Sequence, residues 1–385
     1  MQQHSSHNFL ARPLRLISRA WHWPAKKPRK VPGSFLELTP EALKLPRLDP
    51  ADTAPSLRNL AQQCSDPRAW LALQQDKHLL LDAQQNFIMH ARTPEYQIGL
   101  RDPLGKPGMR PEHRAALLHE FLQRAAASHK HAVFYQSDEA TLAALNQLSA
   151  KPFYAYKLGE EAIIDLGHFS LEGAAFAGLR QNIRKAERSG LHFEFCPSAD
   201  AAQIAQCAAV SAQWLARRGA SEKRFSLGRF HAPALLGLPL ALIYADRELV
   251  AFANVLQSSD RSLLAVDLMR HIDSAPRGTM DLLFARLLAW GQTSGYHEFS
   301  FGMAPLKNVC ADAVAHSGSW LKIAAVVAAK AERFYNFRGV REYKEKWQPS
   351  WRPRYLLVPA RRHALPALIA CAVEIAGGVR AVIRR

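Results

Sequence analysis

The sequence predicts an α/β protein with mixed sheets, built from two units of similar element order in tandem. Segments of helical and of strand periodicity alternate along most of the chain, and several strands follow one another across short turns. With 385 residues, the chain is also long enough for two ordinary domains. No repeat is visible in the residues themselves, so the tandem arrangement is inferred from element order alone.

The first unit is expected between residues 36 and 165, after a basic N-terminal arm of residues 1–35. Hydrophobic periodicity and turn residues define its elements. The predicted helices are 40–64, 111–128 and 139–148. The predicted strands are 70–73, 78–81, 87–91, 96–100, 132–136, 152–158 and 162–165, with a turn at 84–86.

The second unit is expected between residues 166 and 360, followed by a C-terminal amphipathic helix within residues 361–385. Its first helix should end at Gly190, and Asp200 should cap the next helix. The predicted helices are 171–189, 200–217, 279–291 and 319–335. The predicted strands are 192–195, 241–245, 249–256, 262–269, 298–302 and 354–358.

The charge of the chain indicates a polyanionic partner. It has 50 Lys and Arg against 33 Asp and Glu, a formal net charge of +17, which favours nucleic acid or anionic lipid. Basic residues concentrate in the N-terminal arm, in 180–188 and in 338–354, where aromatic residues alternate with them. The arm suits a short interfacial helix or a disordered basic tail, and the 180–188 face suits a binding surface or a solvated helix face.

Several function classes lack support in the sequence. The five cysteines are scattered without metal-ligand spacing, and no serine-hydrolase, zinc-protease or P-loop motif is present. We therefore expect no metal and no cofactor. Because no uninterrupted apolar segment is long enough to span a bilayer and none resembles a secretory signal, we expect a cytoplasmic protein.

The segment 264–280 is the most informative local architecture. A strand carrying Asp267 and Arg270 leads through a loop to Gly278 and a helix N-terminus, which is a natural seat for an anion. In a regular strand these two side chains would point to opposite faces, and a bulge would bring them to the same face. The alternative is an ordinary strand-loop-helix connection with a surface ion pair.

Ordered motifs across residues 40–360 resemble the C-terminal catalytic domain of the bacterial phosphatidylglycerol lysyltransferases, also known as multiple peptide resistance factors or aminoacyl-phosphatidylglycerol synthases. The motifs are RDPLG (101–105), VFYQ (133–136), KLGEE (157–161), FSLEG (169–173), LRQNIRKAERSG (179–190), VDLMR (266–270), SFGMAPL (300–306), ERFYNFRGVREYKEKW (332–347) and WRPRY (351–355).

The resemblance implies a tandem of two GNAT-like acyltransferase units, of which the second carries the active site. It also implies transfer of an amino acid, lysine or alanine, from aminoacyl-tRNA to phosphatidylglycerol. The enzyme would act peripherally at the inner face of the cytoplasmic membrane, where the product changes membrane charge and resistance to cationic antimicrobial peptides. Its partners would be aminoacyl-tRNA and anionic phospholipid, and the reaction would need no metal or cofactor.

The resemblance also implies roles for residues at matching motif positions. Asp267 would bind the substrate α-ammonium, Arg270 a phosphate or the acyl carbonyl, and Lys346 or Lys344 would stabilise charge near the lipid phosphate. The catalytic set is Asp267, Arg270 and Lys346. The substrate-binding set is Lys344, Gly278, Met303, Tyr343, Arg180, Arg184 and Arg338.

The chain departs from the family pattern in three places. Family members typically carry a transmembrane flippase region ahead of this domain, Arg101 stands where a Gly-Asp-Pro turn is usual, and Lys307-Asn308 follows the SFGMAPL motif. Residues 12–30 and the helix 365–383 are candidates for membrane contact. Transfer to a different lipid, a peptide or a sugar, and a non-catalytic RNA- or membrane-binding module, remain the alternatives.

Overall fold

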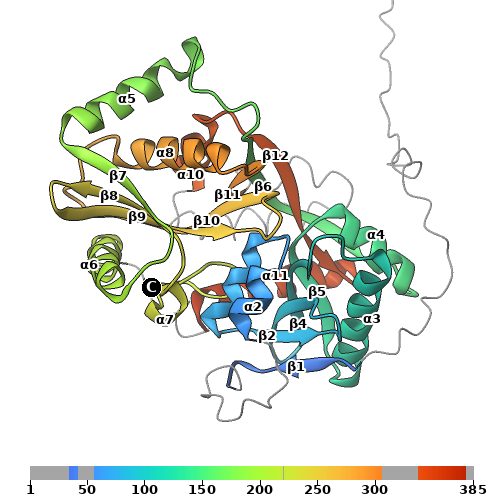
Figure 1. Cartoon of the computed structure of the whole chain (residues 1–385). Helices are drawn as coiled ribbons and strands as arrows, with labels where there is room; N and C mark the ends of the chain where they lie inside the picture. The colour runs from blue at the N-terminus through green and yellow to red at the C-terminus, as the bar shows by residue number, and fades with distance from the viewer. Residues whose placement is uncertain (1–33, 42–55, 220, 306–336, 379–385) are drawn as a thin grey trace, which may run out of the picture.

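The computed structural model describes residues 34–41, 56–219, 221–305 and 337–378. Within these ranges, helices pack against one continuous sheet of 12 strands in the order β1-β2-β3-β4-β5-β12-β6-β11-β10-β9-β8-β7 (Figure 1). Each half of this order has the GNAT-like acyltransferase topology. The predicted fold class, an α/β tandem of two such units, is therefore confirmed.

The first half of the sheet begins at the edge strand β1. Its strands are β1 (Leu36–Leu38), β2 (His78–Leu81), β3 (Phe87–Arg92), β4 (Tyr96–Leu104), β5 (His131–Ser137) and β12 (Ser350–Val358). Its helical elements are α2 (Leu57–Gln62), the 3-10 helix η1 (Pro67–Gln74), α3 (Pro111–Ala127), α4 (Glu139–Leu148), η3 (Arg361–His363) and α11 (Ala364–Ala376).

The second half ends at the opposite edge strand, β7. Its strands are β6 (Tyr154–Asp165), β7 (Leu191–Cys196), β8 (Leu240–Ala245), β9 (Glu248–Gln257), β10 (Leu263–His271) and β11 (Glu298–Pro305). Its helical elements are η2 (Ala174–Phe176), α5 (Ala177–Arg188), α6 (Ala201–Arg218), α7 (Ala232–Leu235), α8 (Thr279–Thr293) and α10 (Phe337–Glu345).

The two halves exchange their last strands. β6 follows β5 in the chain but pairs antiparallel with β11, whereas β12 follows β11 and pairs antiparallel with β5. β6 and β12 also pair with each other, from Ser350 opposite Ile163 to Val358 opposite Tyr154. A boundary near residue 165 thus divides the chain but not the sheet.

Each half contains two parallel strands that pair briefly and then part. β4 and β5 pair from Tyr96 to Leu100, and β10 and β11 pair from Leu263 to Ala265. Bulges interrupt the register of β10 between Val266 and Met269, and of β11 between Ser300 and Met303. Such bulges redirect side chains at the point where strands separate, so the opening between β10 and β11 can hold functional groups.

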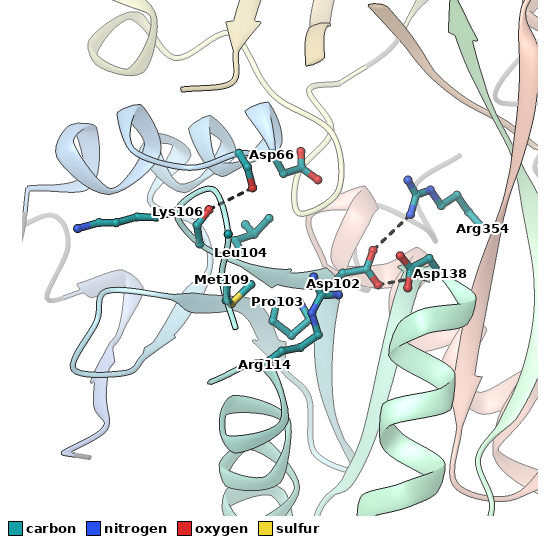
Figure 2. Close-up of a pocket in the computed structure, with 12 residues that line it drawn as sticks. Asp66, Asp102, Pro103, Leu104, Lys106, Met109, Arg114, Asp138 and Arg354 are labelled. Atoms are coloured by element: carbon teal, nitrogen blue, oxygen red, sulfur yellow. Dashed lines mark hydrogen bonds and ion pairs between the residues drawn. The ribbon is translucent and has the colours of Figure 1, made fainter. Parts of the chain in front are cut away.

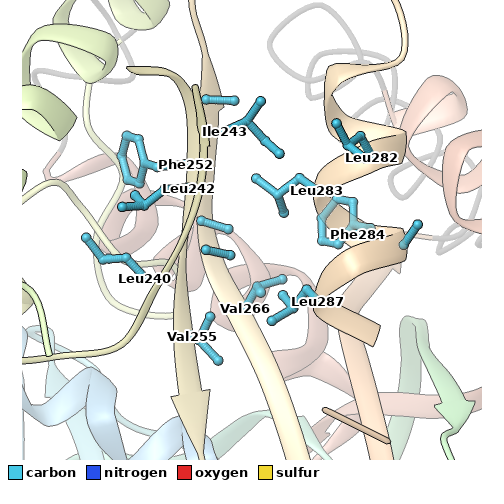
Figure 3. Close-up of a cluster of buried hydrophobic side chains, with 14 of the residues drawn as sticks. Leu240, Leu242, Ile243, Phe252, Val255, Val266, Leu282, Leu283, Phe284 and Leu287 are labelled. Atoms are coloured by element: carbon cyan, nitrogen blue, oxygen red, sulfur yellow. The ribbon is translucent and has the colours of Figure 1, made fainter. Parts of the chain in front are cut away.

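The core of the second half lies between the sheet and α8 (Figure 3). Leu283 and Leu287 of α8 are fully buried and face strand residues such as Val266. α6 contacts β9 and β10, and its N-terminus has a capping box in which Asp200 and Gln203 bond each other's backbone N–H groups. The predicted cap at Asp200 is confirmed, and helices on β10 hold that strand firmly.

Two secondary-structure predictions are wrong. Residues 70–73, predicted as a strand, belong to η1, because Asp66 caps its first turn by accepting from the Arg68 N–H (2.8 Å) and Pro67 fits the first helical position. Residues 152–158 and 162–165, predicted as two strands, form the single strand β6, because β11 and β12 pair along it from either side.

Most other predicted elements are present with their ends shifted, while β1, α7 and α10 were not predicted. Residues 1–33, most of the helix predicted at 40–64, Lys307-Asn308, the helix predicted at 319–335 and residues 379–385 lie outside the described residues. Among described helices, none combines the length and apolar character required to cross a bilayer. The described cysteines, Cys64, Cys196, Cys207 and Cys371, are buried and free.

Candidate active site

Asp267 borders the opening between β10 and β11, in the β10 bulge. Its Oδ1 accepts a hydrogen bond from the Gly228 backbone N–H (2.8 Å), and its Oδ2 is buried with no hydrogen-bond partner among the described residues. Burial raises the pKa of Asp267, although the Gly228 N–H, Lys77 and Arg270 oppose this rise. A buried oxygen without a partner is costly, so this atom is a candidate contact for a substrate donor group.

Gly228 holds the Asp267 carboxylate in place. A Cβ atom at Gly228 would collide with Asp267 Oδ2, so a larger residue could not leave the carboxylate where it is. Gly228 lies between α6 and α7, and its bare backbone approaches the carboxylate closely. This segment therefore fixes the position of Asp267.

The first half of the sheet contributes Lys77, which lies between η1 and β2. Its buried Nζ donates to Leu71 O (3.1 Å) and pairs with Asp76 Oδ1 (2.5 Å). Asp76 Oδ2 in turn accepts from the Phe225 N–H (3.2 Å). Because Lys77 also interacts electrostatically with Asp267, the candidate site lies where the two units meet.

A pocket of about 310 Å³ lies beside this junction. Asp76 and Arg229, the sequence neighbours of Lys77 and Gly228, line it. Glu374 near the end of α11, the following Gly377 and Gly378, and Arg224 line it as well. The pocket thus connects the surroundings of Asp267 with the C-terminal end of α11.

Arg270 follows Asp267 in β10 and interacts with it electrostatically. Its buried guanidinium pairs with Glu222 through Nη1–Oε1 and Nη2–Oε2, both 2.7 Å, and donates to Ser211 Oγ. It also lies 4.9 Å from the centre of the Trp214 ring. Bidentate pairs of this kind are strong and well oriented, so in this structure Arg270 binds α6 and Glu222.

Lys344 of α10 reaches the bulge of β11 on the other side of the opening. Its buried Nζ donates to Gly302 O (3.0 Å) and Met303 O (3.1 Å). Burial lowers the pKa of Lys344 to about 7. Met303 contributes its backbone carbonyl to this contact, and Lys344 can change charge near neutral pH.

Lys346 and Tyr343 connect α10 with the start of α8. Lys346 Nζ is 3.3 Å from Asp281 Oδ1 and 4.6 Å from the centre of the Tyr343 ring. Asp281 is buried and also accepts from Asn182 Nδ2 (3.0 Å). Burial raises the pKa of Tyr343 well above its usual value. The two predicted site residues therefore lie together, beside α5 and α8.

Gly278 is the N-cap of α8, with φ of +95°. A Cβ there would lie 2.6 Å from Asn182 O of α5, so glycine permits the close packing of α5 on α8. The next N–H, of Thr279, is bonded to Pro276 O (3.2 Å). In this structure Gly278 thus contacts α5.

The three predicted substrate-binding arginines differ in placement. Arg180 donates to Leu171 O and Gly173 O (2.7 Å to the latter), so it holds the turn before α5. Arg184 is exposed on α5 beside Lys185 and Arg188, which form a cationic face. Arg338 belongs to α10, but its side chain lies outside the described residues.

A buried charged network that the sequence did not predict extends from Arg101, at the opening between β4 and β5, to Ser300 of β11. Its centre is Glu161 of β6, which is 0% exposed. Glu161 Oε2 accepts from Arg101 Nη2 (3.0 Å) and Arg354 Nε (2.9 Å), and Oε1 accepts from Ser300 Oγ (2.6 Å) and pairs with Arg68. Each oxygen of Glu161 therefore has two partners.

This network adjoins a pocket of about 330 Å³ (Figure 2). Arg354 Nη1 is 3.3 Å from Asp102 Oδ2, and Asp102 Oδ1 accepts from the Asp138 N–H (3.0 Å) and from Thr141 Oγ1 (2.6 Å). Burial raises the pKa of Asp102. The charged groups at this opening thus bind mainly one another.

Comparison with known proteins identifies the family. Residues 58–358 match the family model described as phosphatidylglycerol lysyltransferase, C-terminal. The chain belongs to this family. The phosphatidylglycerol lysyltransferase of Bacillus subtilis is 37% identical over 257 residues, 66% of this chain and 29% of that protein. The one from Staphylococcus haemolyticus is 31% identical over 285 residues, 73% of this chain and 33% of that protein.

This lysyltransferase-family chain therefore spans about a third of the length of these relatives. Two solved structures are matched by this chain over nearly the whole of their own length. L-PGS from Bacillus licheniformis is 32% identical with a TM-score of 0.73, covering 83% of this chain and 96% of that chain. A C-terminal domain from Agrobacterium fabrum, described as that of a lysylphosphatidylglycerol synthetase, is 34% identical with a TM-score of 0.74. The match covers 84% of this chain and 96% of that chain.

The structure explains one departure of this chain from the lysyltransferase family pattern. Arg101 has a φ of +61°, a conformation that favours glycine and costs other residues about 1–2 kcal/mol. The usual Gly-Asp-Pro turn would adopt it freely. Here the ion pair of Arg101 with Glu161 stabilises the arginine in that conformation.

Several residues of this lysyltransferase-family site escaped the sequence analysis. Glu222, Gly228 and Lys77 lie outside the motifs, and only the fold brings them to Asp267 and Arg270. By contrast, the motifs RDPLG, KLGEE and WRPRY contain Arg101, Glu161 and Arg354. Their occurrence in matched motifs was a signal, but nothing in the sequence shows that the three side chains meet.

Proposed function

We propose that this chain transfers an amino acid, lysine or alanine, from aminoacyl-tRNA to a hydroxyl of phosphatidylglycerol. It works as a cytoplasmic protein held peripherally at the inner face of the membrane. Membership of the lysyltransferase family supports this, and the net charge of +17 suits two polyanionic substrates. The observation that carries the proposal is the buried, unpartnered Oδ2 of Asp267.

An aminoacyl ester carries an α-ammonium group next to the carbonyl carbon that reacts. A buried carboxylate is stabilised when such a cation pairs with it, so Asp267 binds this ammonium and Gly228 keeps the carboxylate oriented. Holding the ammonium fixes the position of the carbonyl carbon two bonds away, and positioning of this kind accounts for a large part of an acyl-transfer rate. Asp267 is therefore the donor-binding residue of the proposed enzyme.

The reaction forms an ester bond between the lipid hydroxyl oxygen and the carbonyl carbon, and breaks the bond from that carbon to the ribose oxygen of the tRNA. The hydroxyl proton must leave and the ribose oxygen must gain one. A neutral Lys344 amine has two N–H donors for Gly302 O and Met303 O and a lone pair that can accept this proton. Lys344 then returns the proton to the ribose oxygen.

The remaining cations bind phosphates. Lys346 and the cationic face of α5, formed by Arg184, Lys185 and Arg188, contact the polyanionic substrates near the opening. Lysine carried on phosphatidylglycerol reverses the negative charge of the headgroup. The product therefore weakens the attraction of the membrane for cationic antimicrobial peptides.

The test is expression in a host that lacks aminoacylated lipids, followed by lipid extraction and mass spectrometry. An aminoacyl-phosphatidylglycerol is expected, and its mass identifies the amino acid. Asp267→Asn should lower the amount of product about 100-fold or more, whereas Asp246→Asn, the same change at an exposed turn position, should leave it unchanged. An aminoacylated product of another acceptor would replace phosphatidylglycerol in the proposal, and unchanged lipids together with no transfer from charged tRNA would overturn it.

A further inference from the structure

α11 has one face packed on the first half of the sheet. Ala364, Ala367 and Cys371 are buried in the core that also contains Leu356 and Val358 of β12. These helix residues recur at spacings of three and four, as expected for one helix face. The helix is therefore a fixed part of the fold, and its opposite face has a defined direction.

The opposite face of α11 is apolar and exposed. Ile369 is 48% exposed. Two other large apolar side chains in the described residues, Leu36 and Leu236, are each 45% exposed. Its helix neighbours on this face are also apolar, with Pro366 and Ala372 exposed and Val373 half-buried. Glu374 is the one acidic residue of α11, which has no Lys, Arg or His, and it lines the 310 Å³ pocket.

Cations flank both ends of this apolar face. Arg361 and Arg362 are exposed in η3, immediately before α11. At the other end the exposed Arg224 lies against Gly377, and its backbone N–H bonds to Ile375 O (2.9 Å). An apolar helix face between cationic ends is complementary to an anionic bilayer, where apolar side chains enter the acyl region and cations meet phosphates.

We propose that the exposed face of α11, with Arg361, Arg362 and Arg224, docks on the surface of an anionic phospholipid bilayer. The inference rests on the proposed function, because it supplies the lipid acceptor from that surface. α11 follows residue 358, where the match to the family model ends. The docked helix brings the 310 Å³ pocket, which Glu374, Arg224 and Arg229 line, close to the headgroups.

The experiment uses the full chain with vesicles of phosphatidylcholine alone and of phosphatidylcholine mixed with phosphatidylglycerol. Binding is expected only to the mixed vesicles, and Ile369→Glu should weaken it at least about tenfold, since it replaces buried apolar area with a charge. Leu36→Glu, a matched change on the edge strand β1, should bind like the wild type. Equal binding by both variants would overturn the docking surface.

A second variant tests the contact directly. The tryptophan fluorescence that Ile369→Trp adds should shift to shorter wavelength on mixed vesicles, and brominated lipid should quench it. Added fluorescence that brominated lipid does not quench would contradict docking. If α11 instead covers a second copy of the chain, light scattering would show a dimer that Ile369→Glu dissociates, which would also overturn the inference.

The failure of docking can be told apart from the failure of the proposed function. Transfer to short-chain phosphatidylglycerol, dispersed below its micelle concentration, needs no membrane surface. Ile369→Glu should keep the wild-type rate in this assay and lose activity on vesicles. Absence of transfer by the wild type in both assays would count against the proposed function. Equal activity of the wild type and Ile369→Glu on vesicles would count against docking through α11.

Discussion

In the charged network that reaches the opening between β4 and β5, Glu161 of β6 is fully buried and each of its oxygens has two partners. In the opening between β10 and β11, Asp267 has one oxygen bonded to Gly228 and the other buried without a partner. The strand geometry is the same, because both openings form where two parallel strands part. In the first network both oxygens of the central carboxylate have partners, although Arg101 Nε is buried without a hydrogen-bond partner among the described residues, whereas the second opening leaves one carboxylate oxygen for a ligand.

The comparison separates stability from function in one fold. A buried carboxylate whose two oxygens are both paired, as in Glu161, stabilises and specifies a structure. A single unsatisfied buried group costs free energy that a bound partner can return. We therefore expect substitutions at Glu161 to affect mainly folding and substitutions at Asp267 to affect mainly transfer.

The largest effect is expected for Glu161→Gln. Removing this charge leaves Arg68, Arg101 and Arg354 without their shared partner, so the free energy of unfolding should fall by about 3–5 kcal/mol. Urea unfolding followed by circular dichroism measures it. Glu160→Gln is the matched control on the same strand; its partly exposed pairs with Lys157 and Arg341 should contribute at most about 1 kcal/mol. Equal losses for both variants would contradict the central role of Glu161.

Asp267→Asn should affect transfer and leave folding largely unchanged. Transfer should fall about 100-fold or more, because the neutral amide cannot pair with an ammonium. The free energy of unfolding at neutral pH should stay the same or rise. Since burial raises the pKa of Asp267, its contribution to stability is present at low pH and is lost as pH rises through that pKa. A stability loss as large as that of Glu161→Gln would show that Asp267 is structural.

Gly228→Ala should lower transfer about tenfold to 100-fold, because the new Cβ displaces the Asp267 carboxylate from its position. The effect should fall mainly on KM for the aminoacyl donor. Gly178→Ala serves as the control, since a Cβ at Gly178 meets open space. Wild-type kinetics for Gly228→Ala would show that the carboxylate does not need this support.

The smallest expected effect is that of Lys344 on the pH dependence of the free energy of unfolding. Burial lowers its pKa from the ordinary 10.5 to about 7, so between these values the unfolded chain binds a proton that the folded chain does not. The free energy of unfolding should therefore rise as pH increases from about 7 to about 10. Lys344→Met should lack this rise, whereas Lys185→Met, an exposed change on α5, should keep it. Urea unfolding at several pH values measures the difference.

Local sequence determined much of the fold. Asp200 marks a helix start through its own capping box, and periodicity located most strands and helices. The errors arose where local preference competes with another constraint. Residues 70–73 have a strand-like composition, but the Asp66 cap and Pro67 direct them into η1. β6 is continuous because strands distant in sequence pair along it.

The candidate site was predictable only in part. Asp267, Arg270, Lys344 and Lys346 lie within recognisable motifs, so their identities could be predicted. Their partners could not, because Glu222 and Gly228 come from a segment without a motif and Lys77 comes from the other unit. The sequence likewise does not show that Arg270 is occupied by Glu222 or that an oxygen of Asp267 is left without a partner.

The exchanged strands have a consequence for how the protein is made. β5 ends at Ser137, yet its neighbour β12 begins at Ser350, so the first half cannot complete its sheet until nearly the whole chain has left the ribosome. Until then β5 presents an open edge, and closing so long a loop is slow. Early release of the nascent chain, before β12 emerges, would leave both halves incomplete and open to aggregation.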